Sequence, residues 1–214
     1  LHVTGKQPDG YHRLQSLVAF ADVGDTLDIQ PARTLGFQAN GLFAAAAGPD
    51  ENNLVLRAAR ALAAHYNISA GASIVLIKNL PVGAGMGGGS ADAAATLRAL
   101  VSVWRLPYEP QILQKIAAIL GSDVTACLAC APLWMEGTGH DCTALSLPFD
   151  MPLLLANPGV EVSTKAVYAA LGGDYDAPMV LPAGFENRAA LLQFLARTHN
   201  RLEAPARAIA PMID

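Results

Sequence analysis

The sequence predicts a soluble, folded protein of the α+β class, and three observations support this. Strand-like and helix-like patterns follow one another in mixed order, without the strict alternation of a doubly wound sheet. The 214 residues are 52% hydrophobic and 15% charged, which allows a substantial core and excludes disorder driven by charge. No apolar run reaches the roughly 18 residues of a membrane span. We therefore expect a soluble protein with one large domain or two small lobes.

Charge and cysteine content narrow the class of protein. Fourteen Lys and Arg residues against eighteen Asp and Glu residues give a net charge of −4. Nucleic-acid binding depends on neutralising phosphates, so this balance argues against a nucleic-acid partner. Three cysteines do not make a disulfide framework, and they fit a reducing compartment. We expect a cytoplasmic protein without a membrane partner.

The first half of the chain contains three strand patterns and one helix pattern. Strands are expected at 15–20 and 26–30, with turn residues at 22–25 between them. A continuous β-branched run at 73–77 is typical of a buried strand. A helix is expected over 51–66. The apolar residues on one face of that helix are Leu54, Ala58, Ala61 and Leu62.

The second half begins with a helix expected from about Ser90 to Trp104. Pro107 and Pro110 then interrupt the chain before another helix with a clear apolar stripe. The stripe consists of Ile112, Leu113, Ile116, Ile119 and Leu120. The remaining predicted elements are strands at 132–136, 143–147 and 152–156, the last of them buried, and helices at 163–171 and 187–197.

The strongest functional signal is a glycine-rich loop between a strand and a helix. Five of the seven residues from Gly83 to Gly89 are glycine. Glycine permits positive φ and lets a ligand approach the backbone closely. Ser90 follows where an N-cap residue is expected, and the helix after it offers unpaired N–H groups. The loop therefore predicts an anion site suited to phosphate.

Two known phosphate loops fit this segment poorly. A Walker A loop needs Lys directly after its last glycine, and here Ser90 follows. Gly83, Gly85 and Gly88 satisfy Gly-x-Gly-x-x-Gly, but the acidic residue expected about 20 residues later is missing from a second strand. The nearest candidate, Glu109, lies between two prolines. A nicotinamide-dependent oxidoreductase thus stays only as an alternative.

Four segments resemble one kinase family. Pro81–Ala93 is similar to the ATP-binding motif of the GHMP small-molecule kinases. Thr4–His12, Gly121–Val124 and Asn157–Thr164 resemble segments of one branch, the kinases that act on 4-diphosphocytidyl-2-C-methyl-D-erythritol. The four segments occur in the family's order and cover nearly the whole chain.

The resemblance implies a two-lobe GHMP kinase fold. Residues 1–148 would form the N-terminal ATP-binding lobe, of the ribosomal S5 domain 2 type, and residues 149–214 an incomplete C-terminal α+β substrate lobe. The chain begins at Leu1 and stops at Asp214, so we expect a fragment lacking both termini. The family's catalytic lysine would lie before Leu1, and without it the fragment would be impaired.

The resemblance also implies roles for individual residues. Asp123 matches the catalytic base, and Ser90 is a candidate Mg²⁺ contact. Tyr11, His12, Thr164 and Tyr168 match the pocket for the cytidyl group. The residues matched to ATP binding are Asn53, Lys78, Pro81, Val82, Gly83, Ala84, Gly85, Met86, Gly87, Gly88, Gly89 and Ser90.

The implied reaction is ATP-dependent phosphorylation, with Mg²⁺, of the 2-hydroxyl of 4-diphosphocytidyl-2-C-methyl-D-erythritol. This is a step of non-mevalonate isoprenoid precursor synthesis, and the partner is a small-molecule substrate. An alternative within the superfamily is a kinase of homoserine or mevalonate type. The sequence does not determine the oligomeric state.

Overall fold

The computed structural model describes residues 1–48 and 51–213. The chain forms two compact units, each built from separate stretches of sequence. The first unit contains residues 1–21, residues 83–85 and the residues from Cys130 onward, and the second contains residues 22–82 and 86–129. The expected lobe boundary after residue 148 coincides with neither unit's limits, and that division stays a prediction.

The second unit contains a three-stranded sheet. Its strands are β3 (Thr26–Ala32), β4 (Gly36–Asn40) and β5 (Gly71–Ile77), in the order β3-β5-β4. β5 lies between an antiparallel partner, β3, and a parallel partner, β4. β4 was not predicted. A parallel pair needs a long crossover, and the chain between β4 and β5 supplies one.

That crossover contains a short 3₁₀ helix, η1 (Ala44–Ala46), and the helix α1 (Leu54–His65). α1 starts where the Asn53 side chain accepts hydrogen bonds from the N–H groups of Val55 and Leu56. Its buried face is slightly rotated from the predicted one, because Leu54 and Ala61 are only partly buried. The buried residues of α1 are Val55, Leu56, Ala58, Ala59 and Leu62.

Three further helices follow β5: α2 (Gly88–Val103), α3 (Pro110–Leu120) and α4 (Ser122–Ala129). α4 was not predicted from the sequence. In α3 the predicted stripe is wrong at Ile119, which is 77% exposed. Ala117 takes its place, because the buried face follows the spacing of Leu113, Ile116, Ala117 and Leu120.

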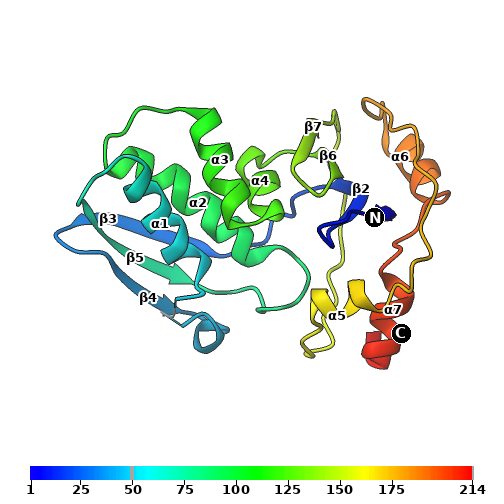
Figure 1. Cartoon of the computed structure of the whole chain (residues 1–214), viewed down its shortest axis with the longest axis horizontal. Coiled ribbons are helices and arrows are strands. Elements are labelled where there is room, and N and C mark those ends of the chain that lie inside the picture. Colours follow the sequence, from blue (N-terminus) through cyan, green and yellow to red (C-terminus); the bar gives the residue numbers. More distant parts are fainter. Residues whose placement is uncertain (49–50, 214) are drawn as a thin grey trace. The chain divides into compact units, whose positions relative to one another are not determined.

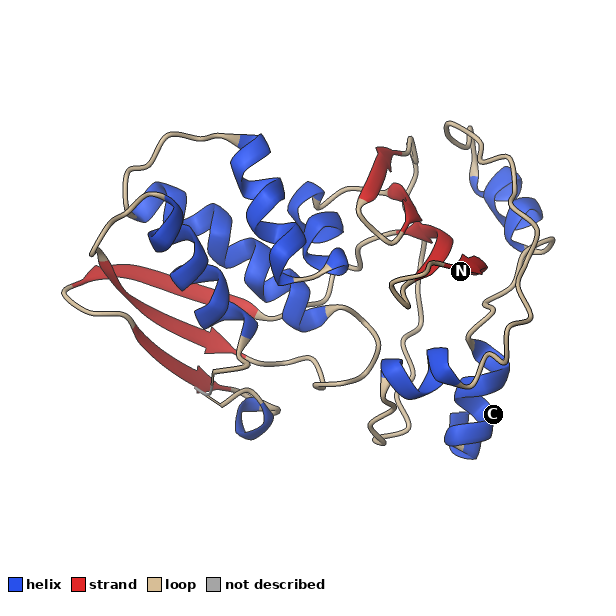
Figure 2. Cartoon of the chain, in the orientation of Figure 1, coloured by secondary structure: helices blue, strands red, loops and turns tan. Residues whose placement is uncertain are grey.

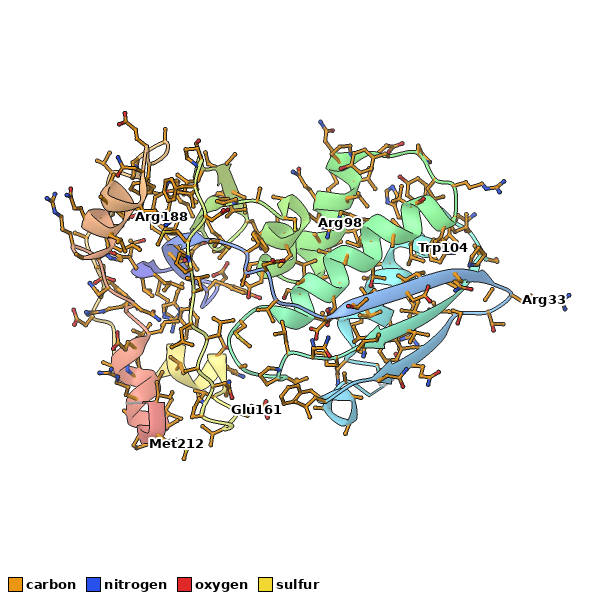
Figure 3. All side chains as sticks on the ribbon, turned by 180° about the vertical axis from the view of Figure 1, so that it is seen from behind. Arg33, Arg98, Trp104, Glu161, Arg188 and Met212 are labelled. Carbon is orange, nitrogen blue, oxygen red and sulfur yellow. The ribbon has the colours of Figure 1, made fainter. Side chains whose placement is uncertain are left out.

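The helices α1 and α2 cover one face of the sheet β3-β5-β4 (Figure 1). Only that face of β5 is buried, since Ile74 and Leu76 are 1% exposed while Ile77 is 41% exposed. The continuous apolar run therefore forms a one-sided strand, which corrects the expectation of a fully buried one. Trp104, after the end of α2, donates a hydrogen bond from Nε1 to the Gly71 carbonyl at 3.0 Å (Figure 3).

The first unit contains a four-stranded antiparallel sheet (Figure 2). Its strands are β1 (His2–Lys6), β2 (His12–Val18), β6 (Leu133–Gly137) and β7 (Asp141–Ala144), in the order β1-β2-β6-β7. β1 was not predicted, and the other strands confirm predicted ones with shifted ends. A cluster of Trp134, Leu145, Phe185 and Leu191 forms an apolar centre of this unit.

Three short helices complete the first unit: α5 (Thr164–Ala169), α6 (Arg188–Leu195) and α7 (Glu203–Ile209), followed by the 3₁₀ helix η2 (Pro211–Ile213). α5 and α6 confirm the helices expected at 163–171 and 187–197. Phe194 of α6 contacts the ring of Trp134, whose Nε1 donates to the Pro182 carbonyl at 2.6 Å.

The buried strand expected at 152–156 is wrong. This segment has no regular structure, and Leu154 is 94% exposed. An extended apolar segment becomes a buried strand only when another strand supplies hydrogen-bond partners and a layer covers it. In the described part of the chain, the paired strands are those of the two sheets above.

Within residues 1–48 and 51–213, no helix has both the length and the apolar character needed to cross a membrane.

The packing of α2 on the sheet predicts a large effect of truncating its central leucine. Leu97 is fully buried, so Leu97→Ala should lower the free energy of unfolding by about 2–5 kcal/mol. Ile119→Ala on α3 is the control, because that side chain is 77% exposed and should cost about 0.5 kcal/mol or less. Urea denaturation followed by tryptophan fluorescence measures both. Equal effects would contradict the assigned core.

Candidate active site

The glycine-rich loop connects β5 to α2, and its backbone requires glycine. Gly83, Gly85 and Gly87 have φ angles of +71°, +70° and +70°. L-residues with side chains rarely adopt this left-handed conformation, which costs them roughly 1–2 kcal/mol. The alternation of glycine in this loop is therefore explained by its backbone path.

The helix α2 begins at Gly88, two residues earlier than predicted. Gly87 is the N-cap residue, and Ala91 donates the first helical hydrogen bond to the Gly87 carbonyl at 2.9 Å. Ser90 lies in the first turn, so the prediction of Ser90 as N-cap is wrong. The N–H groups of Gly88, Gly89 and Ser90 precede any helical acceptor, and with the helix dipole they form an environment that favours anions.

Close to the first residue of α2 lies a buried group of charged side chains formed by Asp25, Lys78 and Asp92. The Lys78 ammonium donates to Asp25 Oδ2 at 2.5 Å and to Asp92 Oδ2 at 2.8 Å. All three side chains are buried: Lys78 is 4% exposed, Asp25 is 1% exposed and Asp92 is 7% exposed. The other oxygen of Asp25 accepts from the backbone N–H groups of Asn79 and Leu80, at 2.6 and 2.8 Å.

The electrostatic balance differs between the two carboxylates. Burial raises the pKa of Asp92 to about 6, although the hydrogen bond and charge of Lys78 act in the opposite direction. Burial also acts to raise the pKa of Asp25, but hydrogen bonds from Lys78, Leu80 and Asn79 hold it below its ordinary value. Burial acts to lower the pKa of Lys78, and the two carboxylates overcome this and raise it. Lys78 is therefore charged at neutral pH.

Asn53, the other residue matched to the nucleotide outside the loop, is the N-cap of α1. Its Oδ1 accepts from the N–H groups of α1, and its Nδ2 donates to the carbonyls of Ala47 and Gly48, the latter at 2.9 Å. Asn53 thus joins the start of α1 to the preceding chain. Its proximity to a bound nucleotide stays a prediction, as does that of Lys78.

Asp123 lies in the first turn of α4. The next residue, Val124, is fully buried, and this orients the turn while the Asp123 side chain stays accessible. Arg98 of α2 donates to the carbonyl of Cys127 at 2.9 Å and so fixes α4 against α2 (Figure 3). Desolvation of the carboxyl group raises the pKa of Asp123 above its ordinary value. A raised pKa makes a carboxylate a better proton acceptor.

The residues matched to the cytidyl pocket lie in the first unit. The rings of His12 and Tyr168 are stacked, with centroids 4.9 Å apart and planes 27° apart. Tyr175 meets His12 in an edge-on arrangement, with centroids 6.1 Å apart and planes 61° apart. Desolvation, followed by the charge of Lys6, lowers the pKa of His12, which favours a neutral imidazole.

The neighbouring pocket residues are placed by local turns. Asp9 accepts from the Tyr11 N–H at 3.0 Å, and the Tyr11 side chain is 67% exposed. Thr164 is the first residue of α5, whose N-cap, Ser163, accepts from the Ala166 N–H at 3.3 Å. α5 thus carries both Thr164 and Tyr168.

Sequence reasoning missed Asp25, Asp92 and Tyr175. Asp92 lies inside the recognised glycine motif, so its proximity to the loop was available as a signal. Asp25 was interpreted only as a turn residue, and it meets Lys78 across 53 residues of sequence. Tyr175 had no motif around it.

Comparison with known proteins places the chain in a family. The family model "GHMP kinases N terminal domain" matches residues 53–130. The whole chain is 44% identical to a 4-diphosphocytidyl-2-C-methyl-D-erythritol kinase of Sinorhizobium medicae and 46% identical to one of Cereibacter sphaeroides. It spans 73% and 74% of the lengths of these two relatives. The chain belongs to the 4-diphosphocytidyl-2-C-methyl-D-erythritol kinase family.

Solved structures agree with membership of this kinase family. A crystal structure of 4-(cytidine 5'-diphospho)-2C-methyl-D-erythritol kinase matches 98% of this chain and 74% of its own, with a TM-score of 0.71 and 31% identity. A homoserine kinase from Cytophaga hutchinsonii matches 78% of this chain and 55% of its own, at a TM-score of 0.56 and 20% identity, and shares the fold. The predicted α+β GHMP kinase fold and kinase class are confirmed, and the oxidoreductase alternative is not supported.

The left-handed backbone at Gly87 predicts that a side chain at this position lowers the stability of the protein. Gly87→Ala places a side chain at φ +70° and should lower the free energy of unfolding by about 1–2 kcal/mol. Because the first turn of α2 would shift, ATP affinity should fall as well. Gly36→Ala is the matched control, since Gly36 has no positive φ and open space around an added Cβ. Thermal unfolding and calorimetric titration with ATP measure the two effects. An unchanged Gly87→Ala protein would contradict the role of the left-handed backbone.

Proposed function

We propose that this chain carries the ATP-dependent phosphorylation of the 2-hydroxyl of 4-diphosphocytidyl-2-C-methyl-D-erythritol, a step of non-mevalonate isoprenoid precursor synthesis in the bacterial cytoplasm. The observation that carries the substrate assignment is the stacked pair His12–Tyr168, preceded in sequence by the exposed ring of Tyr11. Aromatic faces stack on nucleobases, and a cytidyl group offers such a base. The names of the relatives support the same substrate.

The ATP phosphates are assigned to the glycine-rich loop. The N–H groups of Gly88, Gly89 and Ser90 provide donors and the positive end of the α2 dipole. Pro81–Met86 would complete the loop around the nucleotide. Phosphoryl transfer relies mostly on positioning and on stabilising charge on the phosphoryl oxygens, which such a loop supplies.

Mg²⁺ fits this arrangement as an ion carried by the nucleotide. The ion prefers oxygen ligands and is often held by substrate phosphates with one or two protein groups. The Ser90 hydroxyl in the first turn of α2 is the proposed protein ligand, because the nearby carboxylates of Asp25 and Asp92 already bind Lys78. When bound, the ion neutralises charge on the β- and γ-phosphates.

Asp123 is the proposed general base. The acceptor 2-hydroxyl oxygen forms a bond to the γ-phosphorus, the bond to the ADP oxygen breaks, and the hydroxyl proton passes to the Asp123 carboxylate. An accessible carboxylate whose pKa is raised by desolvation suits this task. Thr164 and the neutral His12 would offer hydrogen-bonding groups to the cytosine edge.

Replacing Asp123 tests the chemistry. In the parent-length protein, Asp123→Asn keeps the shape of the side chain but removes the proton acceptor, so kcat should fall by about 10²–10⁴-fold while ATP affinity is retained. In the unaltered protein, kcat should decrease on acidification through an apparent pKa above the ordinary 3.9 of Asp, because protonation removes the base. A coupled ADP-release assay across pH measures both.

Asp28→Asn is a suitable control for this experiment, because Asp28 lies on the exposed face of β3. An Asp123→Asn protein with normal turnover would exclude Asp123 as the base. Loss of activity together with loss of ATP binding would point to a folding defect.

Replacing Tyr168 tests the substrate. Tyr168→Ala should weaken binding of the cytidyl substrate by about 1–3 kcal/mol, the contribution of one stacking contact, and leave ATP affinity unchanged. Tyr108→Ala is the matched control, since that ring is 69% exposed in the second unit. Calorimetric titrations with each ligand measure the difference. Preference of the unaltered protein for homoserine or mevalonate would overturn the substrate assignment and leave the kinase class in place.

A further inference from the structure

The buried charges of Asp25, Lys78 and Asp92 require an explanation beyond stability. Transferring each ion from water costs several kcal/mol, and apolar side chains in place of a buried ion pair are often neutral or stabilising. The group nevertheless combines two short ion pairs with two backbone hydrogen bonds. Such geometry fixes the relative positions of the segments that it joins.

Those segments are the two ends of the glycine-rich loop. Asp25 binds the N–H groups of Asn79 and Leu80, where the chain leaves β5. Lys78 then connects Asp25 to Asp92, which lies in α2 after the loop. A continuous path of hydrogen bonds therefore links the entry of the loop to its exit.

The group also lies directly against the first helical residue. A Cβ atom added at Gly88 would be 3.3 Å from Lys78 Nζ and 3.5 Å from Asp25 Oδ2. The side of Gly88 that would carry a side chain thus faces the buried charges. The absence of a side chain at Gly88 therefore lets the start of α2 lie close to this group.

We propose that Asp25, Lys78 and Asp92 are positioning residues that set the direction of the phosphate-binding N–H groups at the start of α2. This inference rests on the proposed ATP site. With both carboxylates ionised the group carries one net negative charge, which repels a triphosphate. Its benefit for ATP binding therefore comes from geometry and not from attraction.

A double variant separates geometry from charge. Lys78→Met with Asp92→Leu removes one positive and one negative charge, so the net charge of the group is unchanged while the link across the loop is lost. Apolar replacements should preserve folding better than Lys78→Met alone, which leaves two carboxylates without their cation. Arg60→Gln is the control, because it breaks the exposed ion pair with Glu51 in the same unit.

The readout is the affinity for ATP compared with that for adenosine, measured by calorimetry, together with the thermal unfolding midpoint. Adenosine has no phosphates, so a misplaced loop should affect only ATP. We expect the double variant to bind ATP at least about 10-fold more weakly, about 1.4 kcal/mol, with adenosine affinity and the Arg60→Gln protein unchanged.

Each other outcome contradicts the inference in a distinguishable way. Unchanged ATP affinity in a folded double variant would overturn the positioning role alone. Equal losses for ATP and adenosine, with a lower unfolding midpoint, would show a purely structural role. Failure of the unaltered protein to bind ATP would overturn the proposed ATP site and this inference with it.

Discussion

The ammonium group of Lys78, held between the carboxylates of Asp25 and Asp92, connects the end of β5 to the first turns of α2, and the path of the chain between them depends on this link. A loop that is mostly glycine has high conformational freedom, and ordering it costs more than ordering any other residue type. The hydrogen bonds and ion pairs at both ends of the loop offset part of that cost. The left-handed glycines can then follow a defined path without long side chains to hold them.

Placement of Asp123, the proposed general base, depends on a different set of contacts. Asp123 lies in the first turn of a short helix, α4, whose buried Val124 and Cys127 carbonyl are held by α2 and α3. The same long helix α2 therefore supports the glycine-rich loop at its start and α4 along its length. The proposed phosphate site and the proposed base are thus attached to one helix, and phosphoryl transfer requires such groups in fixed geometry.

The sequence allowed much of the fold and the identity of the loop to be predicted, because these depend on local patterns. The glycine spacing of the loop and most of the apolar stripe of α3 are properties of neighbouring residues. The errors arose where a partner decides the outcome. Leu154 looks buried from its neighbours alone, yet it is exposed, and Ile119 lost its place in the core to Ala117. Asp25 and Lys78 meet only because β3 and β5 pair, which no motif in the sequence expresses.

The two tryptophans of the chain lie in different units. The Trp104 indole donates a hydrogen bond to the carbonyl of Gly71, the first residue of β5. The Trp134 indole donates to the Pro182 carbonyl, and its ring belongs to the apolar centre of the first unit. Each indole therefore reports the integrity of one unit through its own emission. Replacing either one with Phe would leave a single tryptophan, which can be excited selectively beside the tyrosines, so that the unfolding of each unit can be followed optically without an attached label.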